Sequence, residues 1–374
     1  MPQIFSTIAC NLDAHILQSS IPLFEMEKVE AIEWSFDALF KADVVPEWFT
    51  DLIGEFSDQG RLICHGVYFS LFSGKWSAEQ QHWLDQLSKL CGQFHFDHIT
   101  EHFGFMTGSD FHKGAPLGIP FNASTLAIGK DRLARIQNAC NCPVGLENLA
   151  FSYSLDEVKL HGDFLGQLVE SVNGFIILDL HNLYCQCHNF ELDFTEFLSF
   201  YPLDRVREMH ISGGSWDAQI PGRIVRRDTH DEAVPPEVFE YLRQAIPRCP
   251  DLKFVVMEQL GTALDTAEKQ ADFQKDFLQM DHIIKSVGET GRISANNFLP
   301  FSPTSPAGLP VEDLALYQQQ MQLSNILEIA GDLKEAQRLL NASDLSDTDW
   351  HIEHWEPHML QTAMNIAQKW KGGF

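Results

Sequence analysis

The chain has 374 residues, of which 44% are hydrophobic and 11% aromatic, enough for one large domain with a sizeable core and a small appendage. Its formal net charge is −26 and its pI is near 4.8, so a nucleic-acid backbone would be repelled and nucleic-acid binding is not expected. No apolar run reaches the roughly 18 residues that a membrane span needs, and the first residues, MPQIFSTIAC, lack the pattern of a secretion signal. Eight cysteines are too few for a disulfide scaffold, so we expect a cytoplasmic protein.

Eight short apolar segments recur along most of the chain, and each is followed by a longer stretch of helical character. They are rich in Ile, Val, Leu and Phe and bounded by polar or turn residues, as expected of strands buried on both faces. Helices are predicted between them, for example over 77–94 and over 154–172, where Ser154 and Glu157 form a capping-box pattern. Alternating strands and helices of this number predict an α/β fold, a parallel (β/α)8 TIM barrel. The predicted strands are 4–10, 30–36, 61–65, 97–103, 143–148, 175–180, 206–211 and 253–259.

The character of the sequence changes after residue 295. Residues 296–310, NNFLPFSPTSPAGLP, are rich in Pro, Ser and Asn, which predicts a linker. Residues 311–331 carry apolar side chains at helical spacing, and further helices are predicted over 334–340 and about 347–371. We therefore expect a metal-binding catalytic barrel at 1–295, a linker at 296–310 and a small helical C-terminal region at 311–374.

Acidic and imidazole side chains stand at the carboxyl ends of most predicted strands. In a (β/α)8 barrel these ends open onto one face, where such enzymes place their chemistry. Carboxylates gathered there would repel one another unless they took up protons or recruited cations, and the interleaved histidines favour cations. Imidazole with carboxylate is a ligand set of zinc, iron and manganese, whereas all-oxygen sites suit calcium and magnesium. The candidate metal ligands are His65, Glu101, His102, Glu147, Asp179, His181, Asn182, His210, Asp228, His230 and Glu258.

This set is larger than one ion can use, because a catalytic zinc takes three protein ligands and an octahedral ion up to six. Some members are expected to orient ligands rather than bind metal. A cluster of two or three ions with bridging carboxylates is the more economical interpretation. A single His or Glu at a strand end is more often structural, so the prediction depends on the recurrence along the chain.

Seven motifs follow one another in a particular order: HGVYFSL (65–71), ITEHFGF (99–105), LENLAFSY (146–153), ILDLHNLY (177–184), REMHISGG (207–214), RDTHDEAVPPEVFEYL (227–242) and VVMEQ (255–259). This series resembles the multinuclear non-haem iron-dependent oxidative enzymes, a family that includes the methanobactin-biosynthesis oxidase and shares the xylose-isomerase-like TIM barrel. The resemblance covers about residues 4–290.

The resemblance implies a barrel that holds two or three iron ions (Fe2+/Fe3+), with O2 as co-substrate. It further implies oxidation of residues, most often cysteines, in a ribosomally synthesised precursor peptide during natural-product maturation, with a leader-binding protein as a common partner. The chain departs from the family at its first strand, which reads IACNLDAH, and at Gly214, where a histidine is usual. Carried over by motif, the iron ligands would be His65, His102, Glu147, Asp179, His210, Asp228, His230 and Glu258, with Asn182 or His181 completing the set and Glu101 as a ligand or a support.

Three cations, Arg223, Arg226 and Arg227, form a basic patch beside the candidate ligand Asp228. They are expected either to hold a carboxylate of the substrate through bidentate contacts or to pair with acids at the surface. For the helical region at 311–374, binding of a leader peptide and simple capping of the barrel are equally consistent with the sequence.

Two other functions remain open at this point. A divalent-metal-dependent isomerase or hydrolase of the xylose-isomerase/endonuclease IV type would also gather His, Glu and Asp at barrel strand ends. A non-catalytic peptide-binding protein on a decayed barrel would require the loss of several ligands. Bound zinc without iron or O2 consumption would favour the first, and protein without stoichiometric metal would favour the second.

Overall fold

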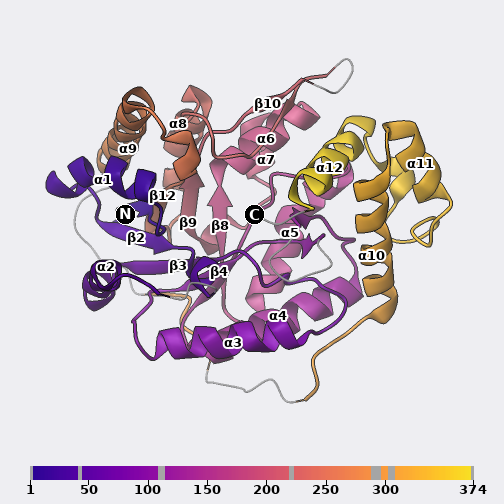
Figure 1. The fold of residues 1–374 in the computed structure, drawn as a ribbon, viewed down its shortest axis with the longest axis horizontal. Helices are drawn as coiled ribbons and strands as arrows, with labels where there is room; N and C mark the ends of the chain where they lie inside the picture. The colour runs from indigo at the N-terminus through magenta and orange to yellow at the C-terminus, as the bar shows by residue number, and fades with distance from the viewer. Residues whose placement is uncertain are drawn as a thin grey trace.

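The computed structural model describes residues 3–40, 44–107, 114–218, 223–287, 296–301 and 308–371. Its eight long-range strands are β1 (Phe5–Ala9), β2 (Ala31–Trp34), β3 (Leu62–Gly66), β4 (Ile99–Glu101), β7 (Val144–Glu147), β8 (Phe175–Asp179), β9 (Val206–Ile211) and β12 (Phe254–Met257). They are parallel and close into a barrel in the order β1-β12-β9-β8-β7-β4-β3-β2 (Figure 1). The predicted (β/α)8 barrel is therefore confirmed.

Helices alternate with these strands and surround the barrel (Figure 1). They are α1 (Ala14–Glu25), α2 (Glu47–Asp58), α3 (Ala78–Cys91), α4 (Ala123–Cys140), α5 (Leu155–Glu170), α6 (Leu180–Phe190), α7 (Phe194–Leu198), α8 (Pro236–Ala245) and α9 (Ala267–Val287). Short 3-10 helices cover Phe36–Leu39, Leu203–Arg205, Ile246–Arg248, Gly261–Ala263 and Ile352–His354. Of the helices within the described residues, none is long and apolar enough to cross a membrane.

Two small antiparallel hairpins extend the segments that follow barrel strands. One pairs β5 (Phe105–Met106) with β6 (Pro116–Leu117), and the other pairs β10 (Trp216–Asp217) with β11 (Val225–Arg226). The second hairpin leads directly into the loop that carries Asp228 and His230.

The start of α5 shows how a predicted cap is used. The Ser154 hydroxyl accepts the N–H of Glu157 at 3.3 Å, as the capping-box pattern predicts. The Glu157 carboxylate also accepts the N–H of Tyr153 at 2.7 Å. The cap thereby also fixes the loop that leads from β7 to the helix.

Side chains of the barrel strands alternate between two environments. The outward-facing ones join the large apolar core between the strands and the helices. Part of the interior is apolar and is filled by Phe5, Ala31, Ile63, Phe254 and Val256. Closer to the carboxyl ends of the strands, the interior becomes polar, with Glu208 and His210 of β9 both fully buried.

The C-terminal region forms α10 (Leu314–Ile329), α11 (Leu333–Asn341) and α12 (Pro357–Trp370), which lie together at one side of the barrel (Figure 1). They pack on segments that follow barrel strands. The Trp355 ring stacks on Tyr153 with ring centroids 3.8 Å apart, and the Gly74 N–H donates to Gln320 at 2.9 Å. The predicted domain limit at 295 and residues 302–307 and 372–374 of the predicted linker and tail lie outside the described residues.

Candidate metal centre

Three of the candidate ligands meet where β3, β4 and β7 end, and we call them the His65 group: His65, His102 and Glu147. The Nε2 atoms of the two histidines are 3.3 Å apart. The Glu147 Oε2 atom lies 3.3 Å from Nε2 of His65 and 3.4 Å from Nε2 of His102. Three atoms that normally act as metal ligands thus point at one small volume.

The hydrogen bonds on the far side of each ring fix its tautomer. The Thr100 hydroxyl donates to the Cys64 carbonyl at 3.1 Å, so it accepts the Nδ1 proton of His65 at 2.9 Å. Nδ1 of His102 donates to the Gly66 carbonyl at 2.9 Å. Each Nε2 therefore carries a lone pair. Burial lowers the pKa of His65 to about 4 and also lowers that of His102, so both rings are neutral near pH 7.

Two lone pairs and a carboxylate that face one another repel in a buried site. A cation among them would turn this repulsion into coordination, and neutral imidazole is the form that binds metal. The arrangement of the His65 group therefore fits a metal ion.

A second set, the His210 group, comprises Glu147, Asp179, His210 and Glu258, whose ligand atoms lie within 4.8 Å of one another. Nδ1 of His210 is 3.1 Å from Glu258 Oε2 and 3.8 Å from Glu147 Oε1. Glu147 thus directs Oε2 to the His65 group and Oε1 to the His210 group. A carboxylate in this position has the geometry of a bridge between two ions.

Buried oxygens without donors lie at the same place. Asp179 Oδ1 accepts the N–H of Asn182 at 2.6 Å, but no hydrogen-bond donor within the described parts of the chain reaches Asp179 Oδ2 or the Asn182 side-chain oxygen. Such atoms are costly unless something satisfies them. Burial raises the pKa of Asp179 well above its usual value and that of Glu147 to about 7, because both carboxylates lose hydration among other acids.

The loop after β11 adds Asp228 and His230. Nε2 of His230 is 2.9 Å from Asp228 Oδ1 and 4.0 Å from Glu258 Oε2. His230 has a φ of +52°, a left-handed conformation that is uncommon outside glycine and often marks functional sites. The loop therefore contributes a corner of the site, next to the His210 group.

His181 and Glu101 are placed differently from these residues. Both ring nitrogens of His181 are occupied, since Nδ1 lies 2.9 Å from Asp228 Oδ1 and Nε2 lies 3.3 Å from the Arg226 guanidinium. This position supports Asp228. Glu101 points away from His102 because neighbouring residues of a strand face opposite sides, and its Oε1 accepts the N–H of Phe69 at 3.0 Å. Neither residue belongs to the His65 or the His210 group.

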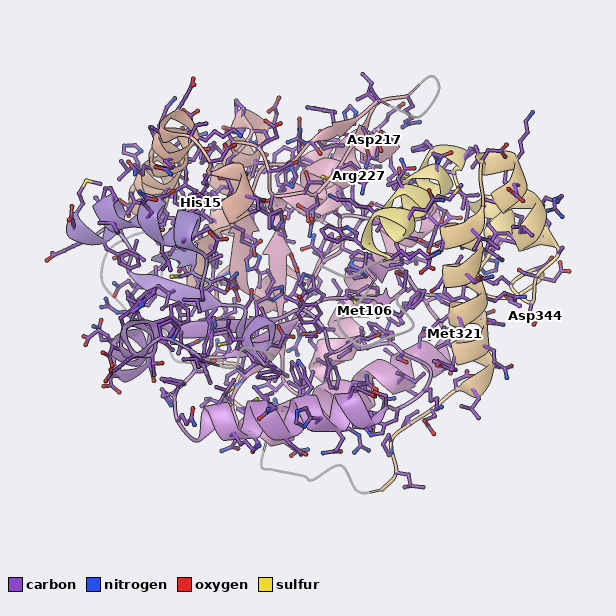
Figure 2. The ribbon with its side chains drawn as sticks, in the orientation of Figure 1. His15, Met106, Asp217, Arg227, Met321 and Asp344 are labelled. Carbon is purple, nitrogen blue, oxygen red and sulfur yellow. The ribbon has the colours of Figure 1, made fainter. Side chains whose placement is uncertain are left out.

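The three arginines of the predicted patch have protein partners. Arg226 is buried, and its guanidinium lies over the Trp216 ring, 4.7 Å from the centroid. Arg227 pairs with Asp217 at 3.4 Å, and Figure 2 shows these two side chains close together. Arg223 donates to the Asn189 carbonyl at 2.5 Å and lies 3.4 Å from a carboxylate oxygen of Glu191. Their role in holding a substrate remains a prediction.

Sequence reasoning missed two buried acids that contact His210 from inside the barrel. Nε2 of His210 lies 3.0 Å from Glu208 Oε1 and 3.2 Å from Glu33 Oε2. The signal for Glu208 was present, because it stands two residues before His210 in one strand and so faces the same side.

Comparisons with known proteins place the chain in a family. A family model described as RiPP precursor modification enzyme MbnB/TglH/ChrH matches residues 38–274. A UPF0276 protein of Acaryochloris marina is 28% identical over 187 residues, which cover 49% of this chain and 64% of that protein. A UPF0276 protein of Caulobacter vibrioides is 26% identical over 186 residues, with the same coverage of 49% and 64%. The chain thus spans just under two thirds of the length of these relatives.

Among solved structures, the IolI protein with a bound zinc atom has a TM-score of 0.51 at 11% identity, covering 78% of this chain and 100% of that chain. At that identity the likeness shows a shared TIM-barrel fold. The family match spans more than half of the chain and includes every candidate ligand, in agreement with the resemblance seen in the motifs. The chain belongs to the MbnB/TglH/ChrH family of RiPP precursor modification enzymes.

Proposed function

We propose that this protein is a multinuclear non-haem iron enzyme that uses O2 to oxidise residues, chiefly cysteines, of a ribosomally synthesised precursor peptide. The observation that carries the proposal is the position of Glu147, whose two oxygens face two different groups of ligand atoms. One ion cannot use both groups and the Asp228–His230 pair beside them, so two or three ions are expected.

The ligand set favours iron among the metals that suit it. It combines imidazole nitrogens with carboxylate oxygens, a mixture that binds iron, manganese and zinc. Zinc has no redox chemistry and would not support an oxidation. Iron, when bound, supplies the electrons that O2 accepts and a Lewis-acidic position for a substrate thiolate.

The chain's own residues would hold and orient this centre. His65 and His102 present Nε2 because Thr100 and the Gly66 carbonyl take their Nδ1 protons. Glu147 is restrained by the Asn182 amide, which donates to its Oε1 at 3.3 Å and to the Asn148 carbonyl at 2.8 Å. Fixing the ligands before the metal arrives reduces the cost of assembling the site.

A peptide substrate is supported by the family, whose description names precursor modification. We propose that a leader-binding partner protein assists, and that α10–α12 act mainly as a cap on the barrel. Burial of Trp355 against Tyr153 supports the capping role, because it commits an aromatic side chain of this region to the barrel itself.

The proposal can be tested with iron-loaded protein prepared without air and a short Cys-containing peptide encoded in a neighbouring reading frame. O2 uptake is followed with an electrode and the peptide mass by mass spectrometry. We expect peptide-dependent O2 uptake and a change in peptide mass for the natural protein, loss of both in His102→Ala, and retention in His354→Ala. His354 is an exposed histidine on the C-terminal region and serves as the matched control.

Bound zinc with no iron and no O2 uptake would contradict the proposal. That result would favour the isomerase or hydrolase alternative.

A further inference from the structure

A row of buried ionisable side chains leads away from the metal centre into the barrel. Glu208 Oε1 lies 3.0 Å from Nε2 of His210, and Glu208 Oε2 lies 2.7 Å from Nε2 of His98. Glu208, His98 and His210 have no exposed surface. Glu208 and His98 are not among the candidate metal ligands, so their burial needs another reason.

The far end of the row is anchored near the amino ends of the strands. Nδ1 of His98 is 3.1 Å from Asp97 Oδ1, and the same oxygen accepts two N–H groups of Arg207, at 2.7 and 3.2 Å. Lys253 also pairs with Asp97. Arg207 is the second residue of β9, so the strand that carries His210 also carries part of the anchor.

The two contacts of Glu208 have a directional consequence. A carboxylate accepts hydrogen bonds and has no proton to donate, so the Nε2 atoms of both His98 and His210 donate to it. Without metal, Nδ1 of His210 donates to Glu258 in the same way. A metal ion would replace that Nδ1 proton, and because the Nε2 proton stays on the side of Glu208, Nδ1 is the nitrogen whose lone pair becomes available. Nδ1 is the nitrogen that lies 3.1 Å from Glu258 and 3.8 Å from Glu147 in the His210 group.

Glu33 is the other acid near this nitrogen, and it is placed less well. Its Oε2 lies 3.2 Å from Nε2 of His210, yet neither Glu33 oxygen makes a hydrogen bond within the described residues. Glu33, Glu208 and His210 also bring ligand atoms within 4.8 Å of one another, which is an arrangement that a further cation could use through Nε2. An Nε2 proton held by Glu208 and a cation on Nε2 are mutually exclusive.

We propose that Glu208 is a positioning residue of the metal centre: it holds the Nε2 proton of His210 and thereby presents Nδ1 to the metal, while His98 and Asp97 keep the Glu208 carboxylate in place. The inference rests on the proposed function, since it assigns His210 as a ligand. Carboxylates that orient a ligating histidine in this way commonly change metal affinity 10–100-fold when they are replaced.

The test compares Glu208→Gln with Glu33→Gln. Both changes keep the shape of the side chain and replace a carboxyl group beside the same nitrogen with an amide. His210 and His98 contact different oxygens of Glu208, and glutamine replaces one of these oxygens with an NH2 group that cannot accept a hydrogen bond. Anaerobic titration with Co(II) alone is the probe, because it gives both an affinity and an absorption spectrum that reports the ligands. Urea unfolding of the metal-free proteins checks that each variant is folded.

We expect Glu208→Gln to weaken one Co(II) site by about 10-fold or more and to change its spectrum. A second site, at the His65 group, should be unchanged, and Glu33→Gln should leave both sites as they are. The inference would be overturned if folded Glu208→Gln had the same Co(II) affinity and absorption spectrum as the natural protein. An equal loss of Co(II) affinity in both variants would overturn it as well and would indicate a cation inside the barrel.

A fallback variant applies if Glu208→Gln does not fold. His98→Gln weakens the support of Glu208 and is expected to give a smaller loss of affinity at the same site. An unchanged site in His98→Gln would refute the proposal. Natural protein that binds no Co(II) would instead contradict the proposed function.

Discussion

Glu147→Gln should stabilise the metal-free protein while removing its ability to hold metal. Burial raises the pKa of Glu147 from 4.5 to about 7 in the folded chain without metal. An acid whose pKa is higher in the folded state binds its proton more tightly there, so its contribution to stability is present below about pH 4.5 and is lost as the pH rises through 7. At about 1.4 kcal/mol per pKa unit, the loss is about 3 kcal/mol above pH 7.

Glutamine does not ionise, so the variant avoids this loss. Its amide can also donate to the Nε2 lone pair of His65, which the carboxylate only repels. We therefore expect metal-free Glu147→Gln to exceed the natural protein in unfolding free energy by about 3 kcal/mol at pH 8, with little difference near pH 4.5. Iron should reverse the order at pH 8, because only the natural protein gains stability from bound metal.

Urea unfolding in chelator at the two pH values measures this difference. Glu353→Gln, at an exposed position, is the matched control and should behave like the natural protein. The reasoning would be refuted if metal-free Glu147→Gln were less stable than the natural protein at pH 8. It would also be refuted if the difference in unfolding free energy between the two proteins were the same at both pH values.

Three further changes test packing and metal linkage. Trp355→Ala should lower the unfolding free energy measured in urea by about 3–5 kcal/mol, because it removes the ring that stacks on Tyr153. Trp48→Ala, at a 53% exposed position, should change the unfolding free energy by less than about 0.5 kcal/mol. Equal effects would show that the C-terminal helices add no stability to the barrel. Gly145→Ala should cost about 1–3 kcal/mol, since a Cβ there would lie 2.5 Å from the Phe175 ring, while Gly54→Ala in α2 meets nothing within 4 Å and should be neutral or stabilising. Adding a chelator to iron-loaded protein should lower its thermal midpoint. The loss of unfolding free energy is about 2.7 kcal/mol for each site that was filled at a free iron concentration of 100 times its dissociation constant. An unchanged midpoint would contradict bound metal.

The barrel was predictable because its strands are buried on both faces and therefore appear as short apolar runs. The parallel topology alone predicts that the strand ends share one face, and His65, Glu147 and His210 do meet there in the structure. The hairpins β5–β6 and β10–β11 were not predicted. With two residues in each strand, they are too short to leave a periodic pattern.

Side-chain direction separates the candidate ligands from their neighbours. Glu101 and His102 are adjacent in the chain, so one faces the interior while the other faces the Phe69 amide, and this alternation could have been read from the sequence. The contact that occupies Nε2 of His181 could not be predicted from the sequence, because its partner Arg226 lies in a hairpin that leaves no sequence signal.

The acids inside the barrel mark another limit. Glu208 was readable as an inward-facing residue beside His210, but a buried glutamate needs a partner, and His98 stands 110 residues earlier in the chain. Only the closed strand order brings the two together.

We propose that one barrel face holds more than one iron through shared carboxylates. The most direct measurement is iron content together with Mössbauer spectroscopy on protein purified without air. We expect two or three irons per chain, with spectra of magnetically coupled neighbours. A single isolated ion, or zinc in place of iron, would contradict it.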